Sequence, residues 1–125
     1  MRRVLQRTDS DCGIAAVAMV SRVPYTIAKA ILFPYGPHPE THFITNKHDL
    51  QRALRYLGIR FERNFLRCPS DLLTLRSSAI LYTIVGQDVA HWVVWDRERK
   101  KLLDPWPPGH RRLRVVSALY VASGR

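Results

Sequence analysis

The sequence predicts an α+β fold in which N-terminal helices pack on a C-terminal antiparallel β-sheet. Helical hydrophobic patterns occupy the first half of the chain, and strand patterns occupy the second half. The 125 residues are 46% hydrophobic, a composition that supports one buried core. We therefore expect one domain that spans residues 1–125.

Two short helices are expected near the N-terminus. Residues 13–22 are small and apolar, as a buried helix requires, and the polar residues 9–11 supply helix-capping side chains just before them. Cys12 then lies in the first turn of this helix. Pro24 ends the helix, and residues 25–33 form a second one before a loop rich in Pro and Gly.

A third helix gives the clearest pattern in the chain. Asn46 can cap its start, and Gly58 can end it. Four apolar residues between these two fall on one face at helical spacing. They are Leu50, Ala53, Leu54 and Leu57.

The second half of the chain reads mainly as β-strands. Residues 79–85 form a nearly continuous apolar run, as expected for a central strand, and short polar turns follow at 86–88 and 97–101. Residues 69–75 contain Pro-Ser-Asp and predict a short helical turn. The expected strands cover residues 59–63, 79–85, 91–96, 102–104, 113–116 and 119–121.

Cys12 is the candidate nucleophile. The N-terminus of a helix favours negative charge, so a thiolate is stabilised there by unpaired backbone N–H groups. Such a thiolate needs an imidazole that pairs with it and later donates a proton to the leaving amine. Of the five histidines, His91 opens an expected strand and is therefore held by a rigid backbone. Cys68 lies in no comparable pattern, and we expect it to take no part in the site.

Two further residues complete this candidate site. If the strands at 91–96 and 102–104 form a hairpin in which Asp104 lies opposite Val93, then Asp104 shares the face of His91 and can orient its ring. A slip of one residue would send Asp104 to the other face. Gln6 precedes the nucleophile by six residues and can donate, with the Cys12 backbone N–H, to a developing oxyanion.

The same residues carry a resemblance to a known family. Residues 6–19 (Gln-Arg-Thr-Asp-Ser-Asp-Cys-Gly-Ile-Ala-Ala-Val-Ala-Met) resemble the nucleophile segment of the C39 peptidases, papain-like domains that cut leader peptides after a double glycine in bacteriocin export. His91-Trp92-Val93-Val94 resembles their histidine strand, and Asp104-Pro105 resembles their Asp-Pro. The resemblance extends to about Pro108.

This resemblance implies a papain-like fold and a cysteine peptidase activity. By carry-over, Cys12 is the nucleophile, His91 the base, Asp104 the residue that orients the imidazole, and Gln6 the oxyanion donor. The implied partner is a peptide or protein substrate, with a glycine-containing cleavage site as in the family. Because the 125 residues contain neither a transmembrane helix nor a phosphate-binding loop of an exporter, we expect a stand-alone domain.

Composition indicates where the protein acts and what it can bind. Lys plus Arg outnumber Asp plus Glu by 20 to 10, and the formal charge of +10 favours an anionic partner. Two cysteines are too few for a disulfide scaffold, and no apolar run reaches the ~18 residues of a membrane span. We expect a cytoplasmic protein. No cofactor is expected, and no metal is assigned to His38, His42 and His48, because no Cys or carboxylate cluster accompanies them.

Two other functions stay open at this point. A peptidase-like scaffold that has lost its activity would bind a peptide without cutting it, although the complete set of four residues favours catalysis. The charge of +10 is compatible with nucleic-acid binding, but no zinc finger, recognition helix or RNA-binding motif accompanies it.

Overall fold

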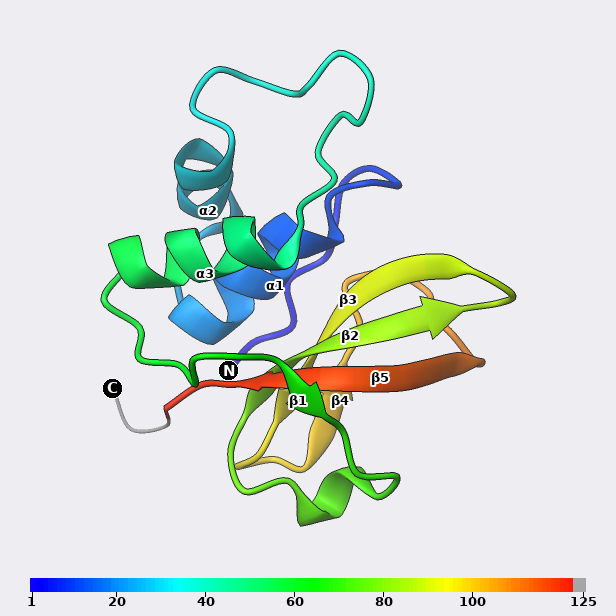
Figure 1. Ribbon diagram of the computed structural model, residues 1–125. Coiled ribbons are helices and arrows are strands. Elements are labelled where there is room, and N and C mark those ends of the chain that lie inside the picture. The colour runs from blue at the N-terminus through cyan, green and yellow to red at the C-terminus, as the bar shows by residue number, and fades with distance from the viewer. Residues whose placement is uncertain (123–125) are drawn as a thin grey trace.

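In the computed structural model, which describes residues 1–122, three α-helices lie beside a five-stranded antiparallel sheet (Figure 1). The helices gather on one side of the sheet, and a long exposed loop between α2 and α3 extends away from it. The α+β fold class is therefore confirmed. The elements are α1 (Cys12–Ser21), α2 (Tyr25–Leu32), α3 (Lys47–Tyr56), β1 (Leu66–Arg67), the 3-10 helix η1 (Leu72–Thr74), β2 (Ala79–Val85), β3 (Val89–Asp96), β4 (Lys101–Leu103) and β5 (Leu113–Tyr120).

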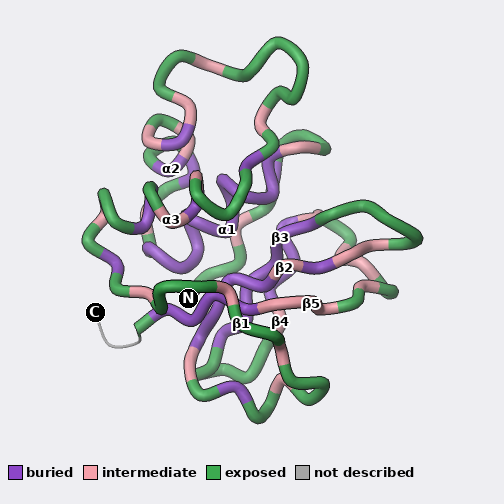
Figure 2. Tube along the Cα trace, in the orientation of Figure 1, coloured by how far each residue is buried: buried purple, intermediate pink, exposed green. Residues whose placement is uncertain are grey.

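Helix α1 is the centre of the helical half. All of its residues are buried, because α2 and α3 pack on it from one side and β3 from the other. Burial on every side explains why its sequence is apolar up to the last residue, Ser21, and shows no polar face. Figure 2 shows the buried residues concentrated where α1 meets the sheet. Arg22 ends the helix in the left-handed conformation, with φ of 57°.

Helix α3 forms as its sequence predicts. Asn46 and Asp49 make a reciprocal capping box at its start, and Gly58 adopts φ of +74° just after its end. Leu50, Ala53 and Leu54 are fully buried against the rest of the core. The helical spacing of these apolar residues therefore decides which face of α3 packs inward.

Helix α2 is short and only partly buried, with Tyr25, Ala28 and Leu32 facing inward. No single helix within residues 1–122 has the length and apolar composition needed to cross a membrane. Helices α1 and α2 reach that composition only as a pair, and a bend of 118° separates them.

The sheet has the strand order β1-β5-β2-β3-β4 and buries apolar side chains on both faces. On the helix side, Ile80 and Val94 join the core around α1. On the opposite side, Leu81 and Val93 pack with Leu75. Burial on both faces explains the nearly continuous apolar run of β2.

Two strand predictions are wrong. Residues 59–63 form no strand, because only Phe61 makes a single bridge, to Val121, and the strand of this region, β1, comes later. The two strands expected at 113–116 and 119–121 are one strand, β5. Its register against β2 shifts between Tyr82 and Thr83, and this irregularity falls where the sequence pattern of β5 is interrupted.

The start of α1 is packed closely enough to exclude a side chain at Gly13. A Cβ added there would lie 1.9 Å from Oγ1 of Thr45, a buried residue, and 3.1 Å from its Cβ. We expect Gly13→Ala to lower the free energy of unfolding by about 1–3 kcal/mol, the usual cost of overpacking. Urea denaturation measures this loss.

Thr45→Ala supplies the matched control, because it removes the hydroxyl that the new Cβ would meet. The double variant should lose clearly less than the sum of the two single variants. Additive losses would contradict the close approach of these two residues.

Candidate active site

Cys12 is the first residue of α1, and its side chain faces β3. The residue is buried, and its Sγ accepts a hydrogen bond of 3.4 Å from the backbone N–H of Trp92. The sulfur therefore lies where the N-terminus of a helix and a strand N–H both favour negative charge. The prediction that Cys12 lies in the first helical turn is confirmed.

His91 lies on β3 with a buried imidazole. The strand begins two residues earlier than expected, at Val89, so His91 lies inside it. The Thr83 hydroxyl on β2 donates to the His91 carbonyl at 2.7 Å and ties the two strands together at this point. Nε2 of His91 contacts Oδ1 of Asp104 at 2.7 Å, which leaves Nδ1 as the ring nitrogen available to Cys12.

Asp104 follows β4 directly, in the register that the sequence predicts. Val94 pairs with Leu103, and extending this register by one residue sets Asp104 opposite Val93. The carboxylate is buried and accepts four hydrogen bonds, two at each oxygen. Besides the imidazole of His91, the donors are the backbone N–H of Trp106, and the backbone N–H and ring Nδ1 of His110.

These contacts set the charges of the pair. Burial lowers the pKa of His91. Hydrogen bonds with Asp104 and Cys12, and the negative charges of both, have the larger opposite effect and raise the pKa to about 9. Burial raises the pKa of Asp104, but hydrogen bonds from His91, Trp106 and His110 and the charge of His91 hold it well below its usual range. At neutral pH the site therefore holds an imidazolium beside a carboxylate.

Gln6 reaches the same site from the N-terminal segment. Its side chain is buried, its Nε2 donates to the Thr8 carbonyl at 2.8 Å, and its Oε1 has no hydrogen-bond partner. An amide nitrogen carries two N–H groups, so one remains for a ligand. The Gln6 backbone N–H donates to the Pro105 carbonyl at 2.9 Å, which joins this segment to the loop after Asp104.

Cys12, His91 and Gln6 line one cavity of about 440 Å³. Much of its lining is apolar, and Ile44 and Val89 on its rim are 59% and 61% exposed. Two of the three tryptophans, Trp92 and Trp106, also line it. Trp95 is buried with the opposite face of the sheet. The cavity can therefore hold an apolar chain beside the Cys12 sulfur.

Asp11 has a structural role that the sequence did not indicate. Its side chain makes no cap bond to α1. Instead, the fully buried carboxylate accepts hydrogen bonds from the backbone N–H groups of Arg7 and Thr8 at 2.8 and 2.9 Å, and also from the Thr8 and Tyr25 hydroxyls. Burial, with the hydrogen bond and charge of Asp11, raises the pKa of Tyr25. Asp11 thereby folds the segment between Gln6 and Cys12.

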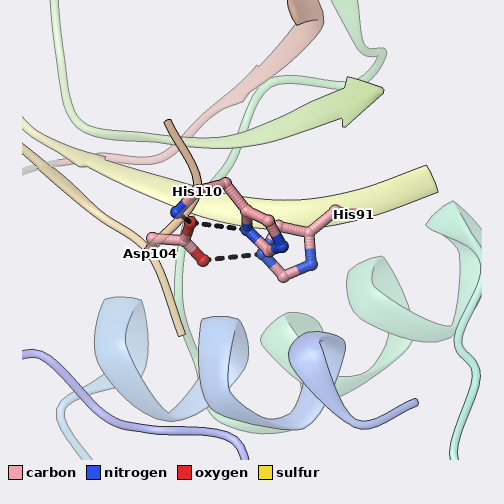
Figure 3. Close-up of side chains that lie close together, drawn as sticks. All are labelled: His91, Asp104 and His110. Atoms are coloured by element: carbon pink, nitrogen blue, oxygen red, sulfur yellow. Dashed lines mark hydrogen bonds and ion pairs between the residues drawn. The ribbon is translucent and has the colours of Figure 1, made fainter. Parts of the chain in front are cut away.

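His110 is the second residue that the sequence did not reveal. It follows a Pro-Pro-Gly turn and bonds to Asp104 through its ring and its backbone (Figure 3). His91, Asp104 and His110 are also close enough, within 4.8 Å, to offer three ligand atoms to a metal ion. However, His91 Nε2 and His110 Nδ1 already contact separate oxygens of the carboxylate. A cation would also have to displace the proton of His91.

Comparison of the whole fold gives matches to solved peptidase domains. The peptidase domain of Streptococcus ComA, described as a bi-functional ABC transporter involved in a quorum sensing pathway, superimposes with a TM-score of 0.69 over 98% of both chains at 17% identity. The peptidase domain of Streptococcus mutans ComA superimposes with a TM-score of 0.64, at 17% identity, over 98% of this chain and 99% of that one. The chain has the fold of a ComA peptidase domain.

This likeness lies in the fold, and sequence comparison adds nothing to it. No family model matches the chain, and no curated protein matches it. The expected fold of the C39 peptidases is therefore supported by the three-dimensional structure, at a sequence identity too low to carry function. Cys12, His91, Asp104 and Gln6 lie together in one site. Their catalytic roles stay predictions.

The charge state of His91 can be measured directly. Because hydrogen bonding and negative charge stabilise its protonated form, we expect the imidazolium to persist through neutral pH and to be lost as the pH rises through about 9. Histidine-selective nitrogen-15 NMR across a pH titration gives the midpoint.

Asp104→Asn and Cys12→Ala should each lower that midpoint, since each removes a negative group beside the ring. His48→Gln, at an exposed position on α3, is the matched control and should leave it unchanged. A parent midpoint near 6.5, the ordinary value for histidine, would show that the three side chains do not interact in solution.

The buried carboxylate of Asp11 gives a separate prediction for stability. Asp11→Asn replaces one acceptor oxygen by an NH₂ group that faces backbone N–H donors, so we expect the free energy of unfolding to fall by about 1–3 kcal/mol. Asp9→Asn changes the same group at an exposed neighbouring position and should have little effect. Equal effects of the two substitutions in chemical denaturation would contradict the role of Asp11.

Proposed function

We propose that the protein is a cysteine peptidase that cuts a peptide bond with Cys12 as nucleophile. The observation that supports this function is the buried His91 imidazole, which bonds to Asp104 through Nε2 and interacts with Cys12 in the same cavity. A thiolate beside an imidazolium that is oriented by a carboxylate is the arrangement needed for acyl transfer to sulfur.

In the first step, Sγ of Cys12 attacks the carbonyl carbon of the substrate. A C–S bond forms, and the π electron pair of the carbonyl moves to its oxygen. The backbone N–H of Cys12 and the free amide N–H of Gln6 donate to this oxyanion. The C–N bond then breaks, the Nδ1 proton of His91 passes to the leaving amine, and a thioester on Cys12 remains.

The second step returns the enzyme to its starting state. Water attacks the thioester while His91, now neutral, takes one of its protons at Nδ1. The C–S bond breaks, the acid product leaves, and the sulfur is again a thiolate beside an imidazolium. Asp104 keeps its contact with Nε2 throughout and stabilises the ring whenever it is charged.

We propose a peptide substrate with apolar side chains and a glycine-containing cleavage site, processed in the cytoplasm. The exposed apolar residues Ile44 and Val89 at the rim of the cavity support the first part. The glycine-containing site rests on the family resemblance of residues 6–19. Cys12 and Cys68 are both free thiols, which suits a reducing compartment.

A peptide library analysed by mass spectrometry tests this function. We expect the parent protein to cut a subset of peptides, and Cys12→Ala to abolish cutting because Cys12 is the thiol that lines the cavity with His91. Gln6→Ala should lower kcat by about a hundred- to a thousandfold, the usual effect of losing an oxyanion donor.

Cys68→Ala is the control, since that thiol lies outside the cavity that contains Cys12. It should leave the rate unchanged. If peptides bind to the parent protein and none is cut, the domain is a peptide-binding module. Cutting that survives in Cys12→Ala would rule out the proposed chemistry.

A further inference from the structure

The carboxylate of Asp104 is held almost equally by two histidines. Its Oδ1 contacts His91 Nε2 at 2.7 Å and the Trp106 backbone N–H at 3.0 Å. Its Oδ2 contacts His110 Nδ1 at 2.8 Å and the His110 backbone N–H at 2.9 Å. Both donors at Oδ2 therefore come from the same residue. Figure 3 shows the two side-chain contacts of the carboxylate, one with each histidine ring.

The loop after β4 is shaped to bring His110 back to Asp104. Gly109 adopts φ of +77°, a conformation that favours glycine, and its backbone N–H donates to the Trp106 carbonyl at 2.8 Å. Arg3 holds the outer side of this loop, donating to the carbonyls of Asp104, Trp106 and Pro107 at 2.6 to 2.9 Å. The position of His110 is thus fixed by the backbone on both sides.

Packing also fixes the ring of His110. It meets the His91 ring edge-on, with centroids 4.6 Å apart and planes at 70°, and it stacks on Trp106 at 5.8 Å and 23°. Its side chain is only 22% exposed. The ring therefore cannot turn away from Oδ2 without losing contact with both neighbours.

We propose that His110 is a positioning residue that fixes the Asp104 carboxylate in the orientation in which Oδ1 serves His91. Two donors at each oxygen hold the last side-chain torsion of Asp104, and the His110 ring supplies one of the two at Oδ2, beside the His110 backbone N–H. The nitrogen that donates, Nδ1, carries a proton both in imidazolium and in one neutral tautomer. This inference rests on the proposed function, since it assigns His110 to the same Cys12–His91–Asp104 site.

Alkylation of Cys12 tests this role without a peptide substrate. Iodoacetate is an anion, so its reaction with a thiolate is helped by an adjacent imidazolium and declines as His91 loses its proton. Neutral iodoacetamide lacks this help. The ratio of the two rates across pH 6 to 10, followed at Cys12 by peptide mass spectrometry, therefore reports the charge on His91 separately from the reactivity of the sulfur.

We expect His110→Leu, which keeps the bulk of the side chain and removes its donor, to move the alkaline decline of this ratio to lower pH by about one unit. One pH unit corresponds to about tenfold in the stability of the imidazolium, which depends on how well Oδ1 stays aligned with Nε2 of His91. His110→Asn places an amide N–H where Nδ1 lies and should restore the parent profile. If the leucine variant does not fold, His110→Ala serves in the same comparison.

The outcomes separate this inference from the proposed function. A parent protein whose ratio shows no alkaline decline would refute the Cys12–His91 pair itself, and the role of His110 with it. A parent that declines near pH 9, with the same or a higher midpoint in His110→Leu, would overturn the role of His110 alone. The same holds if His110→Asn behaves like His110→Leu, because loss of packing would then explain both.

Discussion

The buried contact between His91 and Asp104 is the interaction on which the candidate site depends. It joins the third residue of β3 to the residue that follows β4, so it exists only in one register of that hairpin. A slip of one residue would turn the carboxylate to the opposite face of the sheet. The hydrogen bond also sets the charge of the ring, because the carboxylate stabilises imidazolium against the effect of burial. Strand register and protonation state are therefore coupled.

The other partner of the imidazole comes from the helical half of the molecule. Cys12 is placed by α1, which is fixed by burial on all sides and by the close approach of Gly13 to Thr45. The segment before it is folded around the Asp11 carboxylate, and its backbone bonds to the loop after Asp104. Sulfur, amide and carboxylate are thus held by a continuous set of contacts that crosses from the helices to the sheet.

Strong local patterns predicted most of this fold. The spacing of Leu50, Ala53 and Leu54 places α3, and the apolar run of β2 follows from burial on both faces of the sheet. Residues 59–63 show why alternation alone is weaker, since a strand also needs a partner. On the edge of β5 that faces away from β2, Leu66 and Arg67 form the paired strand, and Phe61 makes only a single bridge. The candidate site was predictable where a reactive residue type coincides with a recognisable local element, as with Cys12 at the start of a helix.

Asp11 and His110 could not be found in that way. Asp11 looks like a helix cap in sequence, but its carboxylate faces the preceding loop because three hydrogen-bond donors of that loop and the Tyr25 hydroxyl converge on it. The role of His110 depends on a turn at Gly109 that returns the chain to Asp104. Such roles arise from tertiary contacts between polar groups, which no local period encodes.

A short cross-linker can show whether the sulfur of Cys12 faces the imidazole of His91. 1,3-Dibromoacetone first alkylates a reactive thiol and then captures a nucleophile within reach of its second carbon. Peptide mapping should find Cys12 joined to His91 through Nδ1, and the cross-link should disappear in His91→Gln while the first alkylation remains. A Cys12 adduct that stays single, or that joins a residue outside the cavity, would show that the two side chains do not face each other.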